Sequence, residues 1–381
     1  MSVYTLTRQT AYVALAALFF AACAPASTPA PTETPIQPTS APQPSNTAPA
    51  ASSDTQKLAA ELAAIFEEST TSDYFSGSVL IAQNGQVILS QGYALADRKQ
   101  NIANTPQTKF GLASMTKQFT AMAIMILQEQ GKLHVQDKMC TYLTDCPEAW
   151  KPITIHQLLT HTSGIPDNTD QFINTDFDSP ASLDQSIADA MAKPLVSQPG
   201  ETFAYENVGY VLLGKIIEAV SGKSYEAFLQ TSIFDPLQMA STGYNHNQPD
   251  LAIGYADQVS VANPLNNWVA FSAGALYSSA EDMYRWEQAL YSEKLVPQKA
   301  IDAIFTSYVK SDTFAGFGYG YGWYVSLNEP RIVKCPGVGG GFNVTIRRYL
   351  DDKATIIILT NLETTDMVTI ANAAQKKLLG H

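Results

Sequence analysis

The sequence predicts a mixed α/β (α+β) fold, in which helices flank one antiparallel sheet and a mainly helical subdomain is inserted into that sheet. Two observations lead to this prediction. Alternating apolar residues, typical of strands, occur near both ends of the globular part, and helical spacing dominates between them. With 381 residues, of which 45% are hydrophobic and 15% charged, the chain can bury a sizeable core.

The N-terminal part of this fold is predicted to contain a helix, a hairpin and a second helix. Apolar residues at helical spacing predict the first helix, which contains Leu58, Leu62, Ile65 and Phe66. Residues 77–94 alternate between apolar and polar on both sides of Asn84-Gly85, a dipeptide typical of tight hairpin turns. We expect the second helix to begin at Ser114 and to stop near Gly131.

Helical and loop patterns fill the middle of the chain, and strand patterns return near its end. The clearest middle helix spans 208–220 and should end at Ser221-Gly222, because glycine is common just after a helix. Near the C-terminus we expect three strands and a closing helix, over 318–326, 342–349, 354–361 and 366–379. Strands from both ends would thus form one sheet, with a helical subdomain at about 130–250 between them.

Residues 1–22 have the composition of an export signal. Arg8 precedes an apolar run over 11–22, which is shorter than the roughly 20 residues of a membrane-spanning helix. The run leads into Phe20-Ala-Ala-Cys23, which resembles a bacterial lipobox with phenylalanine in place of the usual leucine. We therefore expect an exported lipoprotein of the bacterial cell envelope, anchored to the membrane through Cys23; an ordinary cleaved signal is the alternative.

The segment 23–55 links this signal to the globular domain. It consists largely of Pro, Ala, Thr, Ser and Gln, a composition too poor in large apolar residues to form a core. We predict a disordered tether there and a globular domain over 56–381.

Charge and cysteine usage restrict the partners. The net charge of −12 argues against nucleic acid, and no basic patch suits anionic lipid headgroups, so membrane contact would run through the lipid anchor only. Cys140 and Cys146 lie six residues apart in a polar loop and are expected to form a disulfide across a turn. Closing this loop would stabilise the fold by about 2.4 kcal/mol. No His, Asp or Cys cluster has the spacing of a metal site, and no cofactor is expected.

The candidate catalytic residues begin with Ser114-Met-Thr-Lys117 at the start of a predicted helix. A spacing of three places both side chains on one helical face, so a neutral Lys117 could take the proton of the Ser114 hydroxyl. Burial and the helix N-terminus both lower a lysine pKa from its usual value of about 10.4. The same pattern recurs at Ser307-Tyr-Val-Lys310, which we interpret as a chance match on a surface helix.

Tyr205-Glu206-Asn207 is the only Tyr-x-Asn in the chain. In an extended segment, a spacing of two aims both side chains to one side. Tyr205 can then relay a proton to a leaving group, and Asn207 can hydrogen-bond Lys117 and a substrate carbonyl. The alternative is a buried tyrosine followed by an asparagine that caps the next helix.

Five blocks of sequence, in order over about 74–375, resemble the superfamily of class C serine β-lactamases, DD-peptidases and penicillin-binding proteins. The blocks are Phe110–Lys117, Ile153–Pro166, Pro199–Gly214, Ala273–Asp282 and Gly337–Phe342. The resemblance implies a β-lactamase/transpeptidase-like fold in which Ser114 attacks a carbonyl and Lys117 and Tyr205 move the protons. An acyl-enzyme would form and be hydrolysed. The oxyanion would lie between the backbone N–H groups of Ser114 and Val338. His161 falls in a block that we interpret as structural.

The third motif departs from that superfamily. Its members usually place Lys or His, then a small residue or proline, then glycine, on the strand that lines the site. Here Cys335-Pro-Gly337 occupies these positions and Lys334 comes one step early, where strand alternation would point it to the opposite face unless a bulge re-aims it. A thiol at Cys335 weakens the case for β-lactams and for peptides with a C-terminal carboxylate.

Three functions are therefore in competition. The leading hypothesis is a serine hydrolase that cleaves an ester, amide or lactam bond in a small-molecule or peptidoglycan-derived acyl substrate. A true β-lactamase or DD-carboxypeptidase is the first alternative. The second is a catalytically impaired, envelope-bound binding or scaffold lipoprotein. The sequence does not indicate the oligomeric state.

Overall fold

An eight-stranded antiparallel sheet, in the order β2-β1-β13-β12-β11-β10-β9-β8, organises the fold. The computed structural model describes residues 53–167, 179–244 and 250–380, so the predicted signal, Cys23 and almost all of the predicted tether lie outside the described residues. The described residues belong to one compact unit, Ala51–His381. Strands from both ends of this unit pair with each other, as β1 with β13, which confirms the predicted sheet.

The strands of the main sheet are β1 (Gly77–Gln83), β2 (Gln86–Tyr93), β8 (Val309–Lys310), β9 (Phe317–Tyr319), β10 (Tyr324–Ser326), β11 (Ile332–Gly339), β12 (Phe342–Tyr349) and β13 (Ala354–Thr360). The smaller sheets contain β3 (Leu95–Asp97), β4 (Ile102–Ala103), β5 (Phe110–Gly111), β6 (Gly243–Tyr244) and β7 (Leu276–Ser278). Asn84 and Gly85 join β1 to β2 with φ of 52° and 75°. Positive φ at both turn residues is what a two-residue hairpin needs.

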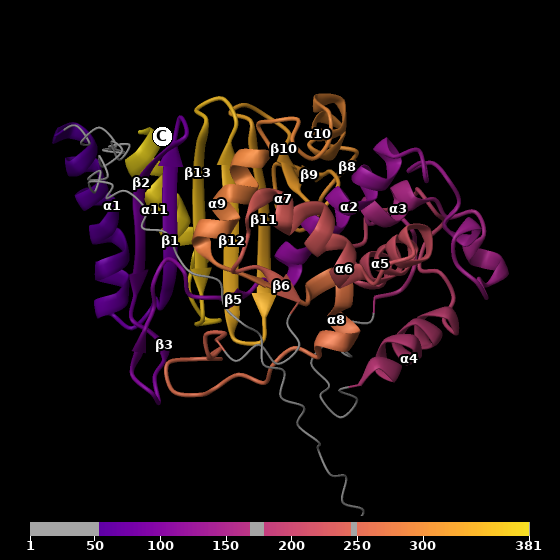
Figure 1. Cartoon of the computed structure of the whole chain (residues 1–381), viewed down its shortest axis with the longest axis horizontal. Coiled ribbons are helices and arrows are strands. Elements are labelled where there is room, and N and C mark those ends of the chain that lie inside the picture. The colour runs from indigo at the N-terminus through magenta and orange to yellow at the C-terminus, as the bar shows by residue number, and fades with distance from the viewer. Residues whose placement is uncertain (1–52, 168–178, 245–249, 381) are drawn as a thin grey trace, which may run out of the picture. The chain divides into compact units, whose positions relative to one another are not determined.

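Two terminal helices cover one face of the sheet. They are α1 (Ser53–Thr71) and α11 (Met367–Leu379), and Figure 1 shows α1 beside β2. Side chains alternate along β1: Val79 and Ile81 pack with these helices, whereas Leu80 and Ala82 pack in the larger core on the other face. α1 begins at Ser53, so the predicted tether over 23–55 overlaps the first helix by a few residues.

The other helices contribute to the larger core, and Figure 1 shows α3, α4, α5 and α6 gathered on the opposite side of the sheet from α1. Their bounds are α2 (Lys117–Glu129), α3 (Ile155–Leu159), α4 (Pro180–Met191), α5 (Val208–Ser221), α6 (Tyr225–Leu229), α7 (Asp235–Leu237), α8 (Asn267–Gly274), α9 (Ala280–Ala289) and α10 (Gln298–Ile304). As predicted, α5 ends at a glycine, Gly222, with φ of 70°.

Two local predictions were wrong. The single strand expected over 318–326 is two short strands, β9 and β10, separated by a turn in which Gly322 has φ of 80°. The chance match at Ser307–Lys310 does not lie on a helix, because α10 ends at Ile304 and Val309–Lys310 forms the edge strand β8. Pairing with β9 overrode the local helical spacing there.

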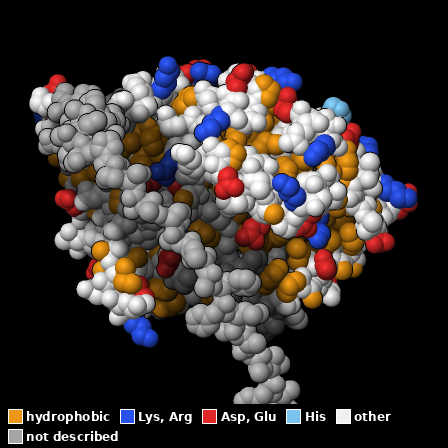
Figure 2. Space-filling model, viewed as in Figure 1, with side chains coloured by type: hydrophobic (Ala, Val, Ile, Leu, Met, Phe, Trp, Pro, Cys, Tyr) orange, Lys and Arg blue, Asp and Glu red, His pale blue; other side chains and the backbone are white. Residues whose placement is uncertain are grey.

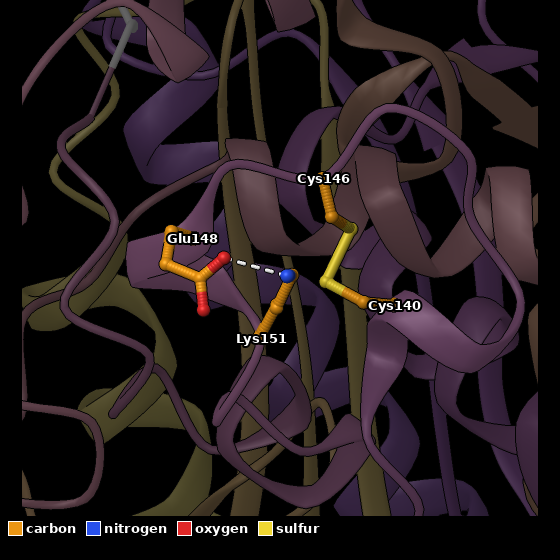
Figure 3. Close-up of a disulfide and its surroundings, with 4 residues drawn as sticks. All are labelled: Cys140, Cys146, Glu148 and Lys151. Atoms are coloured by element: carbon orange, nitrogen blue, oxygen red, sulfur yellow. Dashed lines mark hydrogen bonds and ion pairs between the residues drawn. A yellow bond between two sulfur atoms is a disulfide. The ribbon is translucent and has the colours of Figure 1, made fainter.

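A disulfide joins Cys140 and Cys146, whose Cα atoms are 5.8 Å apart (Figure 3). A short 3₁₀ turn, Met139–Thr141, replaces a regular helix and lets the chain fold back. On the face in Figure 2, acidic and basic side chains are interspersed with apolar ones. No helix in the described part of the chain is long and apolar enough to cross a membrane.

Candidate active site

Ser114 lies in a 3₁₀ turn, Ala113–Thr116, that leads directly into α2. The turn packs against β11 so closely that a Cβ on Gly337 would lie 2.2 Å from the Leu112 carbonyl oxygen and 3.1 Å from the Ser114 nitrogen. Ala113 takes a φ of 43°, a region that non-glycine residues rarely adopt and that recurs at functional sites. The backbone therefore holds Ser114 against the strand, with its side chain partly exposed.

Lys117 is the buried partner of Ser114. Its Nζ lies 3.2 Å from Ser114 Oγ and donates to Asn207 Oδ1 at 2.7 Å and to the Ala273 carbonyl at 3.0 Å. Only 1% of Lys117 is exposed. Burial lowers the pKa of its amine from 10.5 to about 7, which leaves a substantial neutral fraction near neutral pH.

Tyr205 and Asn207 lie in the segment before α5 and contact the pair formed by Ser114 and Lys117. The structure thus brings all four predicted side chains together. Lys117 Nζ lies 5.0 Å from the centre of the Tyr205 ring. The Tyr205 hydroxyl hydrogen-bonds with the Ser114 side chain, while burial raises the pKa of this phenol well above its usual value. A protonated Tyr205 thus lies where it could exchange a proton with Ser114 and Lys117.

Glu206 has a role that the sequence did not reveal. Asn207 precedes α5 but its side chain does not cap the helix; instead Glu206 Oε2 accepts from the Gly209 N–H, and Glu206 Oε1 accepts from Ser163 Oγ at 3.4 Å. Burial raises the pKa of this carboxyl to about 8. Because Glu206 satisfies the first turn of α5, the Asn207 side chain is available to hold Lys117.

His161 lies behind the catalytic side chains and is fully buried. Its Nδ1 accepts from the Glu206 N–H at 3.3 Å, and its ring lies 4.3 Å from that of Tyr205. Within the described part of the chain, Nε2 has no hydrogen-bond partner. Burial and the nearby Lys117 lower the pKa of His161 well below 6.5. A neutral ring packed against Tyr205 supports a structural role.

The third motif lies on a strand beside Ser114, as the resemblance implied, but its chemistry differs. Cys335 is buried at 3% exposure on the helical face of β11, and its sulfur accepts from the Gln118 N–H. Burial raises the pKa of the thiol to about 12, so it is neutral. The register of β11 on β12 runs without a bulge, and Lys334 Nζ lies 3.8 Å from the Phe314 ring centre. Lys334 therefore does not replace the missing cation.

The backbone N–H of Ser114 and that of Val338, the residue after Gly337, are the predicted oxyanion hole. The close approach at Gly337 brings β11 alongside Ser114 N. Neighbouring N–H groups held by a rigid strand and a helix start suit a developing negative charge. Within the described residues, no group of three or more His, Cys, Asp or Glu side chains could hold a metal ion.

The main sheet combines strands from the N-terminal and C-terminal parts of the domain, and a serine–lysine pair lies where this sheet meets the helices. This is the architecture of the serine β-lactamase and penicillin-binding-protein class. Residues 62–380 match the Beta-lactamase family, and the chain belongs to that family.

The similar proteins agree with this assignment. Penicillin-binding protein 4* of Bacillus subtilis (strain 168) is 32% identical over 345 residues, covering 84% of this chain and 76% of its own length. The octameric penicillin-binding protein homologue from Pyrococcus abyssi has a TM-score of 0.77 and 32% identity, covering 84% of this chain and 77% of the other. The D-amino acid amidase from Ochrobactrum anthropi SV3, at 21% identity, TM-score 0.74 and coverages of 85% and 99%, shares the fold.

Proposed function

We propose that this protein is a serine hydrolase that cleaves an ester or amide through an acyl-enzyme on Ser114. One observation carries the proposal: a buried Lys117 amine, whose pKa is lowered to about 7, lies 3.2 Å from Ser114 Oγ. A serine hydroxyl becomes a useful nucleophile when a neighbouring base takes its proton.

The proposed steps follow from the positions of these groups. Neutral Lys117 takes the hydroxyl proton as Ser114 Oγ attacks the substrate carbonyl, and the N–H groups of Ser114 and Val338 hold the oxyanion. When the intermediate collapses, the bond to the leaving group breaks and Tyr205 donates its proton to that group while Lys117 returns a proton to the phenol. Water then attacks the acyl-enzyme in the same way and releases the acid.

A second candidate is reaction with β-lactams or D-amino-acid peptides. Its support is the 32% identity to a penicillin-binding protein over most of this chain. The neutral Cys335 thiol speaks against it, because the third motif then offers no cation to a substrate carboxylate. The remaining alternative is a catalytically impaired protein that acts as a binding or scaffold lipoprotein. In that case Ser114 would form no acyl adduct.

Acyl-adduct mapping separates these functions. The full-length protein is incubated with an alkyl fluorophosphonate, a penicillin and a chromogenic short-chain ester, and the adducts are read by intact mass and assigned by peptide mass. We expect one fluorophosphonate adduct on Ser114 and turnover of the ester. A stable or turned-over penicilloyl adduct would instead favour the second candidate. Absence of any adduct on Ser114 contradicts the catalytic proposal.

We also propose that Cys23 carries a lipid that anchors the protein in the cell envelope. The support is the apolar run over 11–22 followed by Phe20-Ala-Ala-Cys23. In a bacterial host, the wild-type protein should fractionate with membranes and Cys23→Ala should be released. Cys335→Ala is the matched control because its cysteine lies in the folded core. A Cys23→Ala protein that stays on the membrane contradicts lipid anchoring.

A further inference from the structure

A pocket of about 400 Å³ opens directly beside the nucleophile turn. Its wall includes Ala113, which precedes Ser114, and Gly339, which follows Val338. It also includes Gly274, next to the Ala273 carbonyl that binds Lys117. A substrate whose carbonyl lies at Ser114 would therefore present a neighbouring substituent to this pocket.

The described side chains that line the pocket carry no charge. The larger ones are Leu251, Ile253, Val261, Pro264, Leu265 and Phe342, and the side chain of Asn267 is the polar one among them. The other lining residues are glycines and alanines. An apolar group would bury its surface here without leaving a buried ion unpaired.

Glycines let the walls of the pocket pack closely on one another. Gly111 faces the Phe342 ring at a distance that allows no Cβ, with 2.9 Å between the ring and an ideal Cβ. Gly339 and Gly340 have φ of 144° and 64° and lie against Leu265. Their positive φ values favour glycine, so the backbone fixes this part of the wall.

Two lysines on neighbouring elements are engaged in other contacts. Lys117 is held by Ser114, Asn207 and Ala273. Lys109 precedes the lining strand β5, but its Nζ lies 3.6 Å from Asp250. A carboxylate on the substrate would thus enter the pocket without an ionic partner among the described residues, and would lose its hydration.

The apolar surface continues beyond the pocket. Val261 is 64% exposed at the rim, and Val338, on the adjoining end of β11, is 55% exposed. Apolar side chains that remain exposed next to a pocket are typical of a ligand-binding groove. A substituent longer than the pocket could therefore extend over this rim.

We propose that this pocket binds an uncharged, mainly apolar substituent attached to the scissile carbonyl, so that the substrates are neutral apolar esters or amides. The inference rests on the proposed acyl-enzyme at Ser114, and it names the class of substrate. It assigns specificity to a surface formed by β5, α8, the segment 251–265 and the end of β11.

Matched covalent probes test this proposal. Two fluorophosphonates that differ only at the chain end, one hexyl and one carboxypentyl, are compared by the rate at which they label Ser114, read by intact mass. We expect the hexyl probe to react on the order of 100-fold faster on the full-length protein. The ratio of the two rates does not depend on the fraction of folded protein.

Two variants that each introduce an arginine test whether the preference for the hexyl probe arises in the pocket. Leu265→Arg places a cation in the pocket wall and should reduce the ratio by about tenfold. Val259→Arg adds the same charge at a site that is 88% exposed and does not line the pocket, and should leave the ratio within about twofold. If Leu265→Arg does not fold, Val261→Arg at the exposed rim provides the same test.

The outcomes separate the two proposals. Equal or faster labelling by the carboxypentyl probe overturns the neutral-substituent inference while the acyl-enzyme proposal stands. An equal change of the ratio in Leu265→Arg and Val259→Arg shows that the pocket does not bind the chain, which also overturns it. No labelling of Ser114 by either probe overturns the proposed function itself.

Discussion

The pattern Ser-x-x-Lys occurs at two places in this chain, and the two places have opposite environments. At Ser114–Lys117 the lysine is 1% exposed and hydrogen-bonded to Ser114, Asn207 and Ala273. At Ser307–Lys310 the lysine is exposed on β8, the edge strand of the sheet. The same four-residue pattern therefore supports a catalytic pair in one region and none in the other.

Backbone geometry explains the difference. In a helical turn, side chains three apart lie on one face, so Lys117 reaches Ser114. Lys310 instead lies in a strand, and Ser307 lies in the loop between α10 and that strand. Burial then makes Lys117 a suitable base for Ser114, because removal from water lowers the pKa of its amine to about 7. Spacing is thus a necessary condition, and the tertiary surroundings decide.

The largest difference in activity is expected between the alanine variants of the two serines, Ser114 and Ser307. Ser114→Ala removes the nucleophile and should lower kcat/KM for a chromogenic ester on the order of 10⁴-fold or more. Ser307→Ala should leave kcat/KM within about twofold, because Ser307 lies in the loop before β8, whereas the described hydrogen bonds of Lys117 go to Ser114, Asn207 and Ala273. Steady-state kinetics on both variants checks this, and turnover that survives Ser114→Ala contradicts the assignment.

The two lysines give the next largest contrast. Lys117→Met keeps an unbranched side chain of similar length but removes the base, and should lower kcat on the order of 10²–10⁴-fold. Lys310→Met removes an exposed charge and should have no measurable effect. Single-turnover kinetics should show that the loss in Lys117→Met lies in acylation. Equal losses in both variants would mean that the effect is one of net charge.

The pH profile sharpens the comparison further. Lys117 accepts a proton only when it is neutral, so kcat/KM should fall as the pH drops through about 7. The charge of the Asp167 carboxylate raises the Lys117 pKa against the larger effect of burial, whereas Cys335 and Glu206, whose own pKa values are raised to about 12 and about 8, carry little charge near pH 7. Asp167→Asn removes the Asp167 charge and should move the acidic limb of the profile to lower pH by roughly half a unit.

An exposed glutamate in the segment before α5 is the control for this shift. Glu201→Gln should leave the acidic limb where it is, because Glu201 is exposed and does not act on Lys117. An acidic limb that moves to higher pH in Asp167→Asn contradicts the stated charge effect. A limb that does not move, with a lower kcat, would limit the role of Asp167 to the hydrogen bond that it accepts from the Asn207 N–H.

Local sequence predicted much of this fold. The turn at Asn84-Gly85, the glycine end of α5 and the strand over 342–349 follow from rules that act over a few residues, and all three are present. The short strand β8 and the turn that separates β9 from β10 were not predicted, because the pairing of these short strands is decided by neighbours in the sheet.

The candidate site shows the same division. Ser114, Lys117, Tyr205 and Asn207 have recognisable spacing, and the structure brings their side chains together. The role of the Ala273 carbonyl could not be predicted, since it depends on a contact between segments that are distant in the sequence. The contact of Glu206 with the Gly209 N–H spans only three residues, so an acidic side chain just before a helix was the local signal for it. The pocket beside Ser114 was equally hidden, because its walls come from segments between 111 and 342.

The smallest effect is expected at Cys335, the buried residue of the third motif. The thiol is buried and neutral, with its pKa raised to about 12, so it can neither bind a carboxylate as a cation nor act as a base near pH 7. Cys335→Ala should therefore keep kcat/KM within about threefold and cost about 1 kcal/mol of stability from the small cavity, measured by kinetics and denaturant unfolding. A tenfold or larger loss of kcat with unchanged stability would show that the sulfur takes part in the reaction, and the catalytic group beside Lys117 would then have to include it.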